Sequence, residues 1–412
     1  MSLALQEVSV AEKKLVDYNS LIPDVVESLT TLAQKSKNLK IAEVNATALG
    51  GGVAEMLPSE VPLWRDLGLS CGWYVIPPDM AFFEVTKKIH NFLQGKAGDL
   101  TPQEKHLYLE HNKVCARLLD EIETDVLIVH DPQPAAAVAF MKNRPKLVIW
   151  RCHIDTSTPN EAVWSFIFDY LQKFDRFIFT MQDFVHDGIA GEKVSLITPV
   201  IDPFAPKNKL MTKDEAKLLL TSLGVDVTKP LVTQVSRLDP WKDPIGVIDA
   251  CQLAKARVPN LQLAFVAQMA SDDPEGVQIA EEVKAYAKSK EGILFFINMQ
   301  DNDRFVDAFQ TASDVILQKS IKEGFALTVT EAMWKGAIVI GGRVGGIQLQ
   351  IQDGENGFLV NSVEEAAEKI VYVLANQDKM QSISQKAHES VKTRYLMPHL
   401  LLSYLKVFQI YF

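Results

Sequence analysis

The sequence predicts an α/β protein with two domains, each built on a parallel β-sheet that helices cover on both faces. Short apolar runs rich in β-branched residues alternate with longer amphipathic stretches, and this alternation occurs twice along the chain. Parallel strands are buried on both faces, so they read as near-continuous apolar runs. A chain of 412 residues is also longer than one ordinary hydrophobic core can serve, which favours two Rossmann-like domains.

The apolar runs place the expected elements along the chain. In the first half, strands are expected at 39–47, 73–76, 124–130, 146–154 and 175–180, with helices at 53–68 and 160–174. In the second half, strands are expected at 230–238, 261–267, 293–298, 314–318 and 337–342, with a helix at 243–258.

A proline-containing stretch at 196–216 separates the two halves. It carries Pro199, Pro203 and Pro206 and then a charged run. We therefore expect the first domain at residues 1–201 and the second at 202–390, with the last helical pattern, at about 391–412, able to cross back onto the first domain. Ligands of open α/β sheets bind at the carboxyl ends of the strands, so the residues that follow the strands are the candidate site.

Composition and charge narrow the function classes. Hydrophobic residues make up 47% of the chain and charged residues 23%, the usual mix for a globular protein. The net charge of −10 argues against nucleic acid as a partner, because phosphate backbones need a broad basic surface. No apolar run has the length of a membrane span, and the N-terminus has too short an apolar stretch for a secretory signal. We expect a cytoplasmic protein without a membrane partner.

The cysteines point to the same compartment. The four of them are far apart and form no C-x-x-C pair, so neither a metal site nor a disulfide framework is expected, and a reducing environment is the simplest setting. The sequence leaves the oligomeric state open, and a homodimer is one option.

A run of three glycines, Gly50, Gly51 and Gly52, follows the first expected strand and precedes a helix. Such a turn exposes backbone N–H groups that can cradle an anion or let a sugar approach the main chain closely. A bare turn is the alternative interpretation. The run is not G-x-G-x-x-G, so the dinucleotide-binding fingerprint is absent.

Charged and imidazole side chains follow three other strands. Arg237 and Lys242, in VSRLDPWKDP, would suit a diphosphate, although a solvated loop could carry the same charges. In the first domain, two strands end in residues that could bind hydroxyl groups or transfer protons. These are His130 and Asp131 in LIVHDPQP and His153 and Asp155 in VIWRCHID. A histidine that is simply satisfied in the core is the alternative for either imidazole.

The stretch IKEGFALTVTEAMWKG places two carboxylates, Glu323 and Glu331, around a turn that leads into a helix. Thr328 and Glu331 fit the S/T-x-x-E capping box, which would explain Glu331 without any function. The capping box does not explain Glu323.

Two further motifs come with weaker interpretations. Asp301 and Asp303 form a D-x-D pattern that can hold a metal with a nucleotide sugar, but they read better as a surface loop or helix start. The pair Gly345 and Gly346 indicates backbone close to a ligand, and the later DGENG predicts a hairpin turn.

Together these motifs resemble those of the retaining glycosyltransferases of family GT4, which have the GT-B fold of two Rossmann-like domains facing a central cleft. In the second domain the resemblance rests on SRLDPWK, on EGFALTVTE as an E-x7-E element, on VGG and on DGENGFLV. The first domain, through GGGVAEML, FFEVTKKIHNFLQG, VHDPQPAA and WRCHIDTSTPN, is similar to the trehalose glycosyltransferring synthases and to their relatives, the fungal-type trehalose phosphorylases. The match runs from about Ala42 to Val360.

The resemblance implies roles for the candidate residues. Glu323 would contact the donor sugar hydroxyls and Glu331 the nucleotide ribose, Arg237 and Lys242 would neutralise the leaving diphosphate, and His153 would contact the transferred sugar near its 6-hydroxyl. The remaining residues that it implies are, for the donor, Gly51, Gly52, Ser236, Gly324, Phe325, Ala326 and Leu327, and, for the acceptor, Asp131 and Gln133.

The activity implied by the resemblance is transfer of glucose, with retention, from a nucleoside diphosphate glucose to glucose, which forms α,α-trehalose. It needs no metal, no other cofactor and no enzymic base. A trehalose phosphorylase and a related transferase with another acceptor are the nearest alternatives. A glycoside hydrolase using Glu323 and Glu331 would leave the basic pair unexplained, and a two-domain sugar-binding protein would usually be exported.

Overall fold

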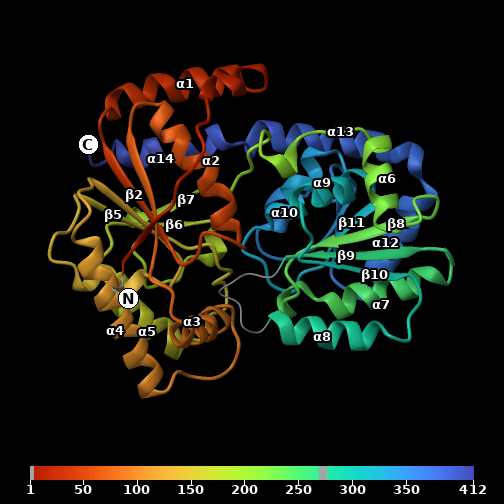
Figure 1. Ribbon diagram of the computed structural model, residues 1–412, viewed down its shortest axis with the longest axis horizontal. Helices are drawn as coiled ribbons and strands as arrows, with labels where there is room; N and C mark the ends of the chain where they lie inside the picture. Colours follow the sequence, from red (N-terminus) through yellow and green to blue (C-terminus); the bar gives the residue numbers. More distant parts are fainter. Residues whose placement is uncertain (1–3, 269–275) are drawn as a thin grey trace. The chain divides into compact units, whose positions relative to one another are not determined.

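The computed structural model describes residues 4–268 and 276–412 and divides into two compact units (Figure 1). The first unit contains the chain up to Pro199 and takes up the chain again at Met397–Phe412. The second unit lies between Val200 and Leu396. The chain therefore returns to its first unit through its last helix.

The described part of the first unit contains a sheet with the strand order β1-β3-β2-β4-β5-β6-β7. β1 is antiparallel to β3, and every other neighbouring pair is parallel. The strands are β1 Gln6–Glu7, β2 Lys40–Asn45, β3 Ser70–Val75, β4 Val126–His130, β5 Leu147–Arg151, β6 Arg176–Phe179 and β7 Val194–Leu196.

Helices cover both faces of this sheet. In Figure 1, α1, α2 and α14 lie on one face and α3, α4 and α5 on the other. The aromatic rings of Trp64 on α2 and of Tyr404 and Phe408 on α14 pack together, which anchors the C-terminal helix. The helices are α1 Pro23–Ala33, α2 Gly52–Asp66, α3 Met80–Leu93, α4 Pro102–Leu119, α5 Glu161–Leu171 and α14 Met397–Phe408.

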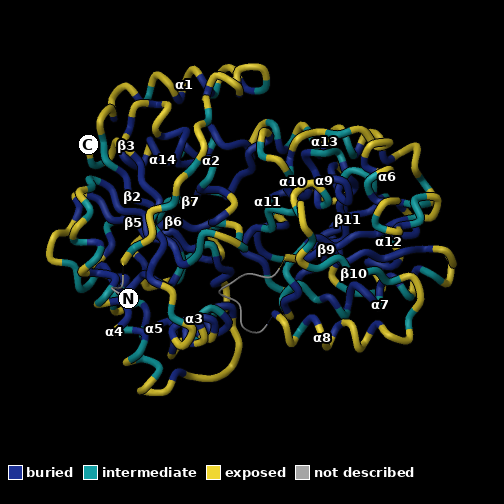
Figure 2. The backbone as a smooth tube through the Cα atoms, in the orientation of Figure 1, coloured by how far each residue is buried: buried dark blue, intermediate teal, exposed yellow. Residues whose placement is uncertain are grey.

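The second unit contains a wholly parallel sheet with the order β10-β9-β8-β11-β12-β13 in its described residues. All of its strands except the edge strand β10, which is half-buried, are buried among helices, as the dark tube of Figure 2 shows for β9 and β11. The strands are β8 Leu231–Val235, β9 Gln262–Ala267, β10 Ile293–Ile297, β11 Val315–Gln318, β12 Val339–Gly342 and β13 Phe358–Val360.

Two helical layers enclose this second sheet as well. Apolar side chains of α7, α8 and α12 form one core with the sheet, and those of α6 and α9 form another on the opposite face. The helices are α6 Lys213–Ser222, α7 Pro244–Lys255, α8 Gly276–Ala287, α9 Asn302–Ala312, α10 Leu327–Trp334, α11 Ile347–Gln350, α12 Val363–Ala375 and α13 Gln377–Arg394.

In each sheet, successive parallel strands are first added on one side of the first parallel strand and then on its other side. The place where the order reverses is the topological switch point. In the first unit this switch point lies between β2 and β4, and in the second it lies between β8 and β11. Ligands of open α/β sheets bind beyond the carboxyl ends of the strands at a switch point. The four segments that leave these strand ends are 46–52, 131–133, 236–243 and 319–326.

Every strand expected from the apolar runs is present, and so are the three helices. The hairpin predicted at DGENG is wrong. Residues 353–357 form a turn, with Gly354 at a φ of 78°, but the strand that follows, β13, pairs in parallel with β12. A hairpin would have required antiparallel neighbours. The turn instead connects α11 to a parallel edge strand.

Candidate functional site

The loop after β8 is shaped by two aspartates. The Asp239 carboxylate accepts the backbone N–H of Trp241 at 2.8 Å and so caps the short 3-10 helix η7, Pro240–Lys242. Asp243 follows with a left-handed φ of 50°, and its carboxylate accepts the N–H of Gly246 at 3.1 Å at the start of α7. Both caps are side-chain contacts of the kind that hold a helix start. They fix the backbone on either side of Lys242.

An ion pair joins this loop to the loop after β11. Lys242 Nζ lies 2.6 Å from Glu323 Oε2, and the Ser320 hydroxyl donates to the same oxygen at 3.0 Å. The two loops are also tied through their backbones, since the N–H of Ile321 donates to the carbonyl of Trp241 at 2.8 Å. Glu323 is buried, whereas Lys242 is partly exposed. The ammonium group is thereby held in place while other N–H directions stay available for an anion.

Other polar groups line the same strand ends. Lys319 forms an ion pair with Asp243. Within the described chain, Ser236 Oγ is buried and has no hydrogen-bond partner. A buried hydroxyl without a partner costs free energy, so it marks a place where a ligand can contribute a hydrogen bond. Ser236 immediately precedes Arg237, which is also partly exposed.

Helix α10 begins without a side-chain cap. Its N-cap is Ala326, which has a left-handed φ of 69° and whose methyl side chain cannot accept a hydrogen bond from the first turn. The predicted capping box is therefore wrong, because Thr328 lies inside the helix and not at its N-cap. An alanine in this backbone region is strained, and the surroundings must hold it there. The first-turn N–H groups of α10 remain suited to an anion or a sugar hydroxyl.

Contacts from the glycine pair hold this strained turn. A Cβ atom on Gly346 would lie 2.5 Å from the carbonyl oxygen of Gly324, so only glycine allows the two backbones to approach this closely. The Gln350 side-chain amide donates to the carbonyl of Phe325. Gly346 therefore has a structural role against the 324–326 turn. The closeness of the glycine pair to a ligand stays a prediction.

Glu331 lies on α10 among cations. It is 1% exposed, and its Oε1 lies 2.6 Å from Lys207 Nζ. Burial alone would raise the pKa of Glu331, but the charges of Lys207 and Lys335 outweigh burial and hold the pKa below its ordinary value. The Lys335 side chain is 1% exposed, and burial lowers its pKa to about 8. Glu331 is therefore an ionised carboxylate in a buried network.

In the first unit, a glycine turn follows β2. Gly50 has a φ of 80°, which favours glycine, and Gly51 is the N-cap of α2, which begins at Gly52. Among the residues that the structure describes, and apart from its two chain neighbours, a Cβ atom on Gly51 would meet no atom within 4 Å. Internal packing therefore does not explain a glycine there, whereas close approach of a ligand would.

The strand ends of β4 and β5 are joined by Asp131. This residue has a left-handed φ of 61°, and its carboxylate accepts the backbone N–H of His153 at 2.8 Å. The backbone carbonyl of the neighbouring Gln133 accepts a hydrogen bond from Asn112 at 3.1 Å. Asp155 is buried and accepts both the N–H and the hydroxyl of Ser157, so its role is to shape the turn.

The two histidines have different environments. His130 is 1% exposed, and its Nε2 lies 2.7 Å from Glu43 Oε2. Its Nδ1 lies 3.0 Å from Nε2 of His153, which is partly exposed. Burial lowers the pKa of His130 to about 3, so this ring is neutral. His130 is therefore a buried histidine whose hydrogen bonds are satisfied in the core. His153 is the imidazole that reaches the edge of the sheet.

Comparison with known proteins identifies the family. A family model described as the N-terminal domain of trehalose synthase matches residues 43–186, and one described as glycosyl transferases group 1 matches residues 218–390. The chain is 44% identical to a trehalose synthase of Thermococcus litoralis over 95% of this chain and 96% of that protein. It belongs to the trehalose synthase family.

The chain is also similar to a second trehalose synthase and, more distantly, to a trehalose phosphorylase. A trehalose synthase of Pyrococcus horikoshii is 42% identical over 99% of both chains. A trehalose phosphorylase of Pleurotus pulmonarius is 28% identical over 79% of this chain but only 50% of that longer protein.

Solved structures establish the fold. A sucrose-phosphate synthase from Thermosynechococcus elongatus matches with a TM-score of 0.69 and 15% identity, over 90% of this chain and 99% of that chain. A UDP-forming α,α-trehalose-phosphate synthase from Burkholderia xenovorans matches with a TM-score of 0.71 and 14% identity, over 90% of this chain and 98% of that chain. The predicted GT-B fold is confirmed.

The family models cover all of the residues chosen from the sequence for the site, but not all of their partners. Lys207, which pairs with Glu331, lies between the two matched ranges. No sequence pattern pointed to Lys207, Lys335 or Ser320, because a single lysine or serine carries no local signal. Glu43 was not predicted either, although a glutamate inside an apolar strand is unusual.

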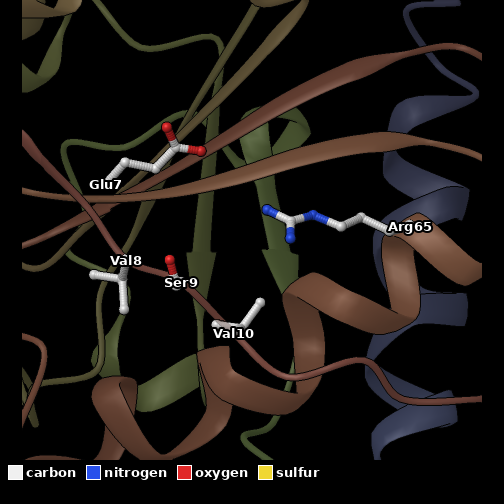
Figure 3. Close-up of a pocket in the computed structure, with 5 residues that line it drawn as sticks. All are labelled: Glu7, Val8, Ser9, Val10 and Arg65. Carbon is white, nitrogen blue, oxygen red and sulfur yellow. The ribbon is translucent and has the colours of Figure 1, made fainter.

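Two other features of this trehalose synthase family member contain none of the residues assigned to the site. Figure 3 shows a small pocket lined by Glu7, Val8, Ser9, Val10 and Arg65, none of which is a predicted site residue. Asp301 is the N-cap residue of α9, so the D-x-D pattern is a helix start.

The described chain shows neither a metal cluster nor a membrane-spanning helix. In residues 4–268 and 276–412, no group of three or more His, Cys, Asp or Glu side chains is arranged to hold a metal ion. No helix in these ranges combines the length and apolar character that a bilayer crossing requires.

Proposed function

We propose that the chain is a retaining glucosyltransferase that forms α,α-trehalose from a nucleoside diphosphate glucose and glucose. The observation that carries the proposal is the Lys242–Glu323 pair at 2.6 Å, held at the switch point of the second sheet in a chain 44% identical to a trehalose synthase. We further propose that the enzyme is cytoplasmic and acts without a metal.

The proposed reaction exchanges one bond for another at the anomeric carbon. The bond from this carbon to the diphosphate oxygen breaks, and a bond to the acceptor hydroxyl oxygen forms on the same face. The acceptor proton passes to the departing phosphate oxygen, so the protein needs no base of its own. The task left to the protein is to stabilise the charge that develops on the diphosphate.

The residues at the strand ends are suited to that task. Lys242 and Arg237 supply positive charge beside the leaving diphosphate, and the uncapped first turn of α10 supplies backbone N–H groups. The Glu323 carboxylate orients Lys242 and accepts hydrogen bonds from hydroxyls of the donor sugar.

Other hydroxyl groups of the sugars would be bound by the first unit. His153 contacts the transferred glucose, and Asp131 and Gln133 contact the acceptor. The bare backbone at Gly51 and Gly52 lets the donor approach α2 closely, which agrees with the open space around a Cβ atom at Gly51.

One observation favours a second candidate, a trehalose phosphorylase that uses phosphate and α-glucose 1-phosphate. The carboxylate assigned to the nucleotide ribose, Glu331, is 1% exposed and already paired with Lys207. A ribose would have to displace Lys207 or share the carboxylate with it, whereas a phosphorylase has no ribose to bind. The higher identity and fuller coverage of the synthases favour the first candidate.

The test is product analysis with purified protein and glucose. UDP-, ADP- and GDP-glucose are supplied in separate reactions, with α-glucose 1-phosphate in parallel. Trehalose from a nucleotide donor alone supports the synthase and identifies its base. Trehalose from glucose 1-phosphate alone supports the phosphorylase. Donor hydrolysis without trehalose contradicts the acceptor assignment and leaves the donor site standing.

A further inference from the structure

A line of hydrogen bonds runs from the core of the first unit to its candidate site. It begins at the Glu43 carboxyl on β2, which is 0% exposed, passes through His130 at the end of β4 and ends at His153 just after β5. The links are 2.7 Å from Glu43 Oε2 to His130 Nε2 and 3.0 Å from His130 Nδ1 to His153 Nε2. The three strands are adjacent in the sheet, so the line crosses it from strand to strand.

Only two proton arrangements satisfy both links when the rings are neutral, because a neutral imidazole has one donor and one acceptor nitrogen. If Glu43 is ionised, His130 donates from Nε2 to Glu43, and His153 donates from Nε2 to His130. His153 Nδ1 then carries a lone pair. If Glu43 is protonated, every donor and acceptor reverses, and His153 Nδ1 carries the proton.

The rings do stay neutral near neutral pH. Burial lowers the pKa of His130 to about 3, and burial also holds the pKa of His153 well below its ordinary value. Burial raises the pKa of Glu43 to about 8, with Arg151 opposing the rise. The carboxyl is therefore the member of this line that gains or loses a proton near physiological pH.

Charged and titratable groups face Glu43 from each neighbouring element. They are Glu60 on α2, Cys71 on β3, Arg151 on β5 and Tyr404 on α14. Arg151 donates to the Tyr404 hydroxyl at 2.6 Å. Burial and then the charge of Glu43 raise the pKa of Glu60 to about 8, so the two carboxyls compete for one cation.

The polar atoms of this region are not all used. In the described chain, Glu43 Oε1, Glu60 Oε1 and Arg151 Nη2 are buried without a hydrogen-bond partner. A core retained only for stability would be better served by apolar side chains than by a partly satisfied network. This favours a role for the network beyond packing.

We propose that Glu43 is a positioning residue that sets the tautomer of His153 through His130, and so decides whether His153 Nδ1 accepts or donates a hydrogen bond to a sugar hydroxyl. The inference rests on the proposed function, because it takes His153 to be the residue that contacts the transferred sugar. It adds two residues that act on this contact indirectly: His130, which is hydrogen-bonded to His153, and Glu43, which is hydrogen-bonded to His130.

The change between the two arrangements moves three protons and balances. One proton from outside binds His153 Nδ1. The proton on His153 Nε2 moves to His130 Nδ1, and the proton on His130 Nε2 moves to Glu43 Oε2. No oxidant or other reactant is needed, and the net result is one proton stored on Glu43.

The first test reads the tautomer directly and needs no substrate. Full-length protein labelled with ¹⁵N-histidine is followed by long-range ¹H–¹⁵N spectra on both sides of the Glu43 pKa of about 8, and a His153→Asn sample assigns the signals. In the wild type, Nδ1 of His153 is expected to change from lone-pair to N–H character as the pH falls. Glu43→Gln is expected to abolish the change, because glutamine cannot ionise.

The matched control is Glu60→Gln, which removes the neighbouring buried carboxyl but leaves the hydrogen-bonded line intact. It is expected to keep the tautomer change at a displaced midpoint. A wild-type His153 with one tautomer throughout, or a change that survives in Glu43→Gln, overturns the proposal.

The second test separates this inference from the proposed function. The pH profile of kcat/KM for trehalose formation is expected to lose one ionisation in Glu43→Gln and to keep it in Glu60→Gln. If no trehalose forms under any condition, the proposed function fails while the spectra still decide the tautomer. If trehalose forms with the same profile in wild type and Glu43→Gln, the proposed function stands and this inference fails.

Discussion

Two buried glutamates, one in each unit, have pKa values that are shifted in opposite directions. Glu43 in the first unit is 0% exposed and its pKa is raised to about 8, whereas Glu331 in the second unit is 1% exposed and its pKa is lowered. The difference lies in the number of cations. Lys207 and Lys335 both act on Glu331, while Glu43 shares a single Arg151 with Glu60. Burial alone does not decide the charge of a carboxyl.

The comparison extends to the chemistry of each unit. The second unit orders ionised pairs across its loops, which suits a highly charged diphosphate. The first unit orders neutral imidazoles and a carboxyl that can be protonated, which suits sugar hydroxyls. Each unit is thus matched to one half of the proposed reactants, and substitutions in the two units should have different consequences.

The largest effect is expected from Lys242→Met. Loss of the ammonium removes charge stabilisation at the diphosphate and should lower kcat/KM by about 10²–10³-fold. Steady-state kinetics measure the effect, with folding checked by circular dichroism. The control is Lys229→Met, whose ammonium forms an exposed pair with Asp226 at 3.0 Å and should leave kcat/KM unchanged. A loss below about tenfold would contradict the role of Lys242.

The next effect is on stability. Glu331→Gln removes the carboxylate that pairs with Lys207 at 2.6 Å and whose charge also acts on Lys335, and it should lower the free energy of unfolding by about 3 kcal/mol, measured by urea denaturation. Glu355→Gln, which breaks an exposed pair with Lys386, should cost less than about 0.5 kcal/mol.

The sign of the pH dependence gives a second check on Glu331. Its pKa is lower in the folded chain than in the unfolded chain, so its stabilisation is present above the unfolded value. That stabilisation is lost as the pH falls through the folded value. Wild type and Glu331→Gln should therefore converge in stability at acid pH. Divergence on acidification would show that the carboxylate is not ionised in the fold.

A smaller effect is expected from Gly51→Ala in the first unit. The added methyl meets no protein atom within 4 Å, and the extended backbone at φ −174° suits alanine, so stability should change by less than about 0.5 kcal/mol. The methyl should nevertheless obstruct the donor and raise its KM by about tenfold, or about 1.4 kcal/mol.

Gly191→Ala is the matched control for Gly51→Ala, since its Cβ also meets nothing within 4 Å. It should change neither stability nor KM. An unchanged KM in Gly51→Ala would place the donor away from this turn.

The smallest effect separates a real capping box from an apparent one. Thr101 on α4 exchanges hydrogen bonds with Glu104 and accepts its N–H at 3.2 Å, so Thr101→Ala should cost about 1 kcal/mol of unfolding free energy. Thr328→Ala should cost less than about 0.3 kcal/mol by cap loss, because the N-cap of α10 is Ala326 and Thr328 lies inside the helix. Equal losses in thermal unfolding would mean that Thr328 caps after all.

Much of the fold followed from local patterns. The strands were readable because a parallel strand is buried on both faces and leaves an apolar run, as in 124–130 and 314–318. The candidate site segments were chosen because glycine, arginine and glutamate follow the expected strands, and the structure places these segments beyond the strand ends. The similarity to the trehalose synthase family, which the sequence motifs suggested, is confirmed at 44% identity.

What the sequence by itself determined is the alternation of elements, their division into two units and the residues that reach the strand ends. Only the tertiary structure decided which side chains these residues pair with. Lys207 reaches Glu331, and Glu43 lies behind His130, although these pairs are far apart in the chain. The start of α10 likewise depends on Gly346 packing against Gly324, which overrides the capping residues nearby. Periodicity is a local property of the chain, whereas charge pairing and close backbone approach depend on which distant segments the fold brings into contact.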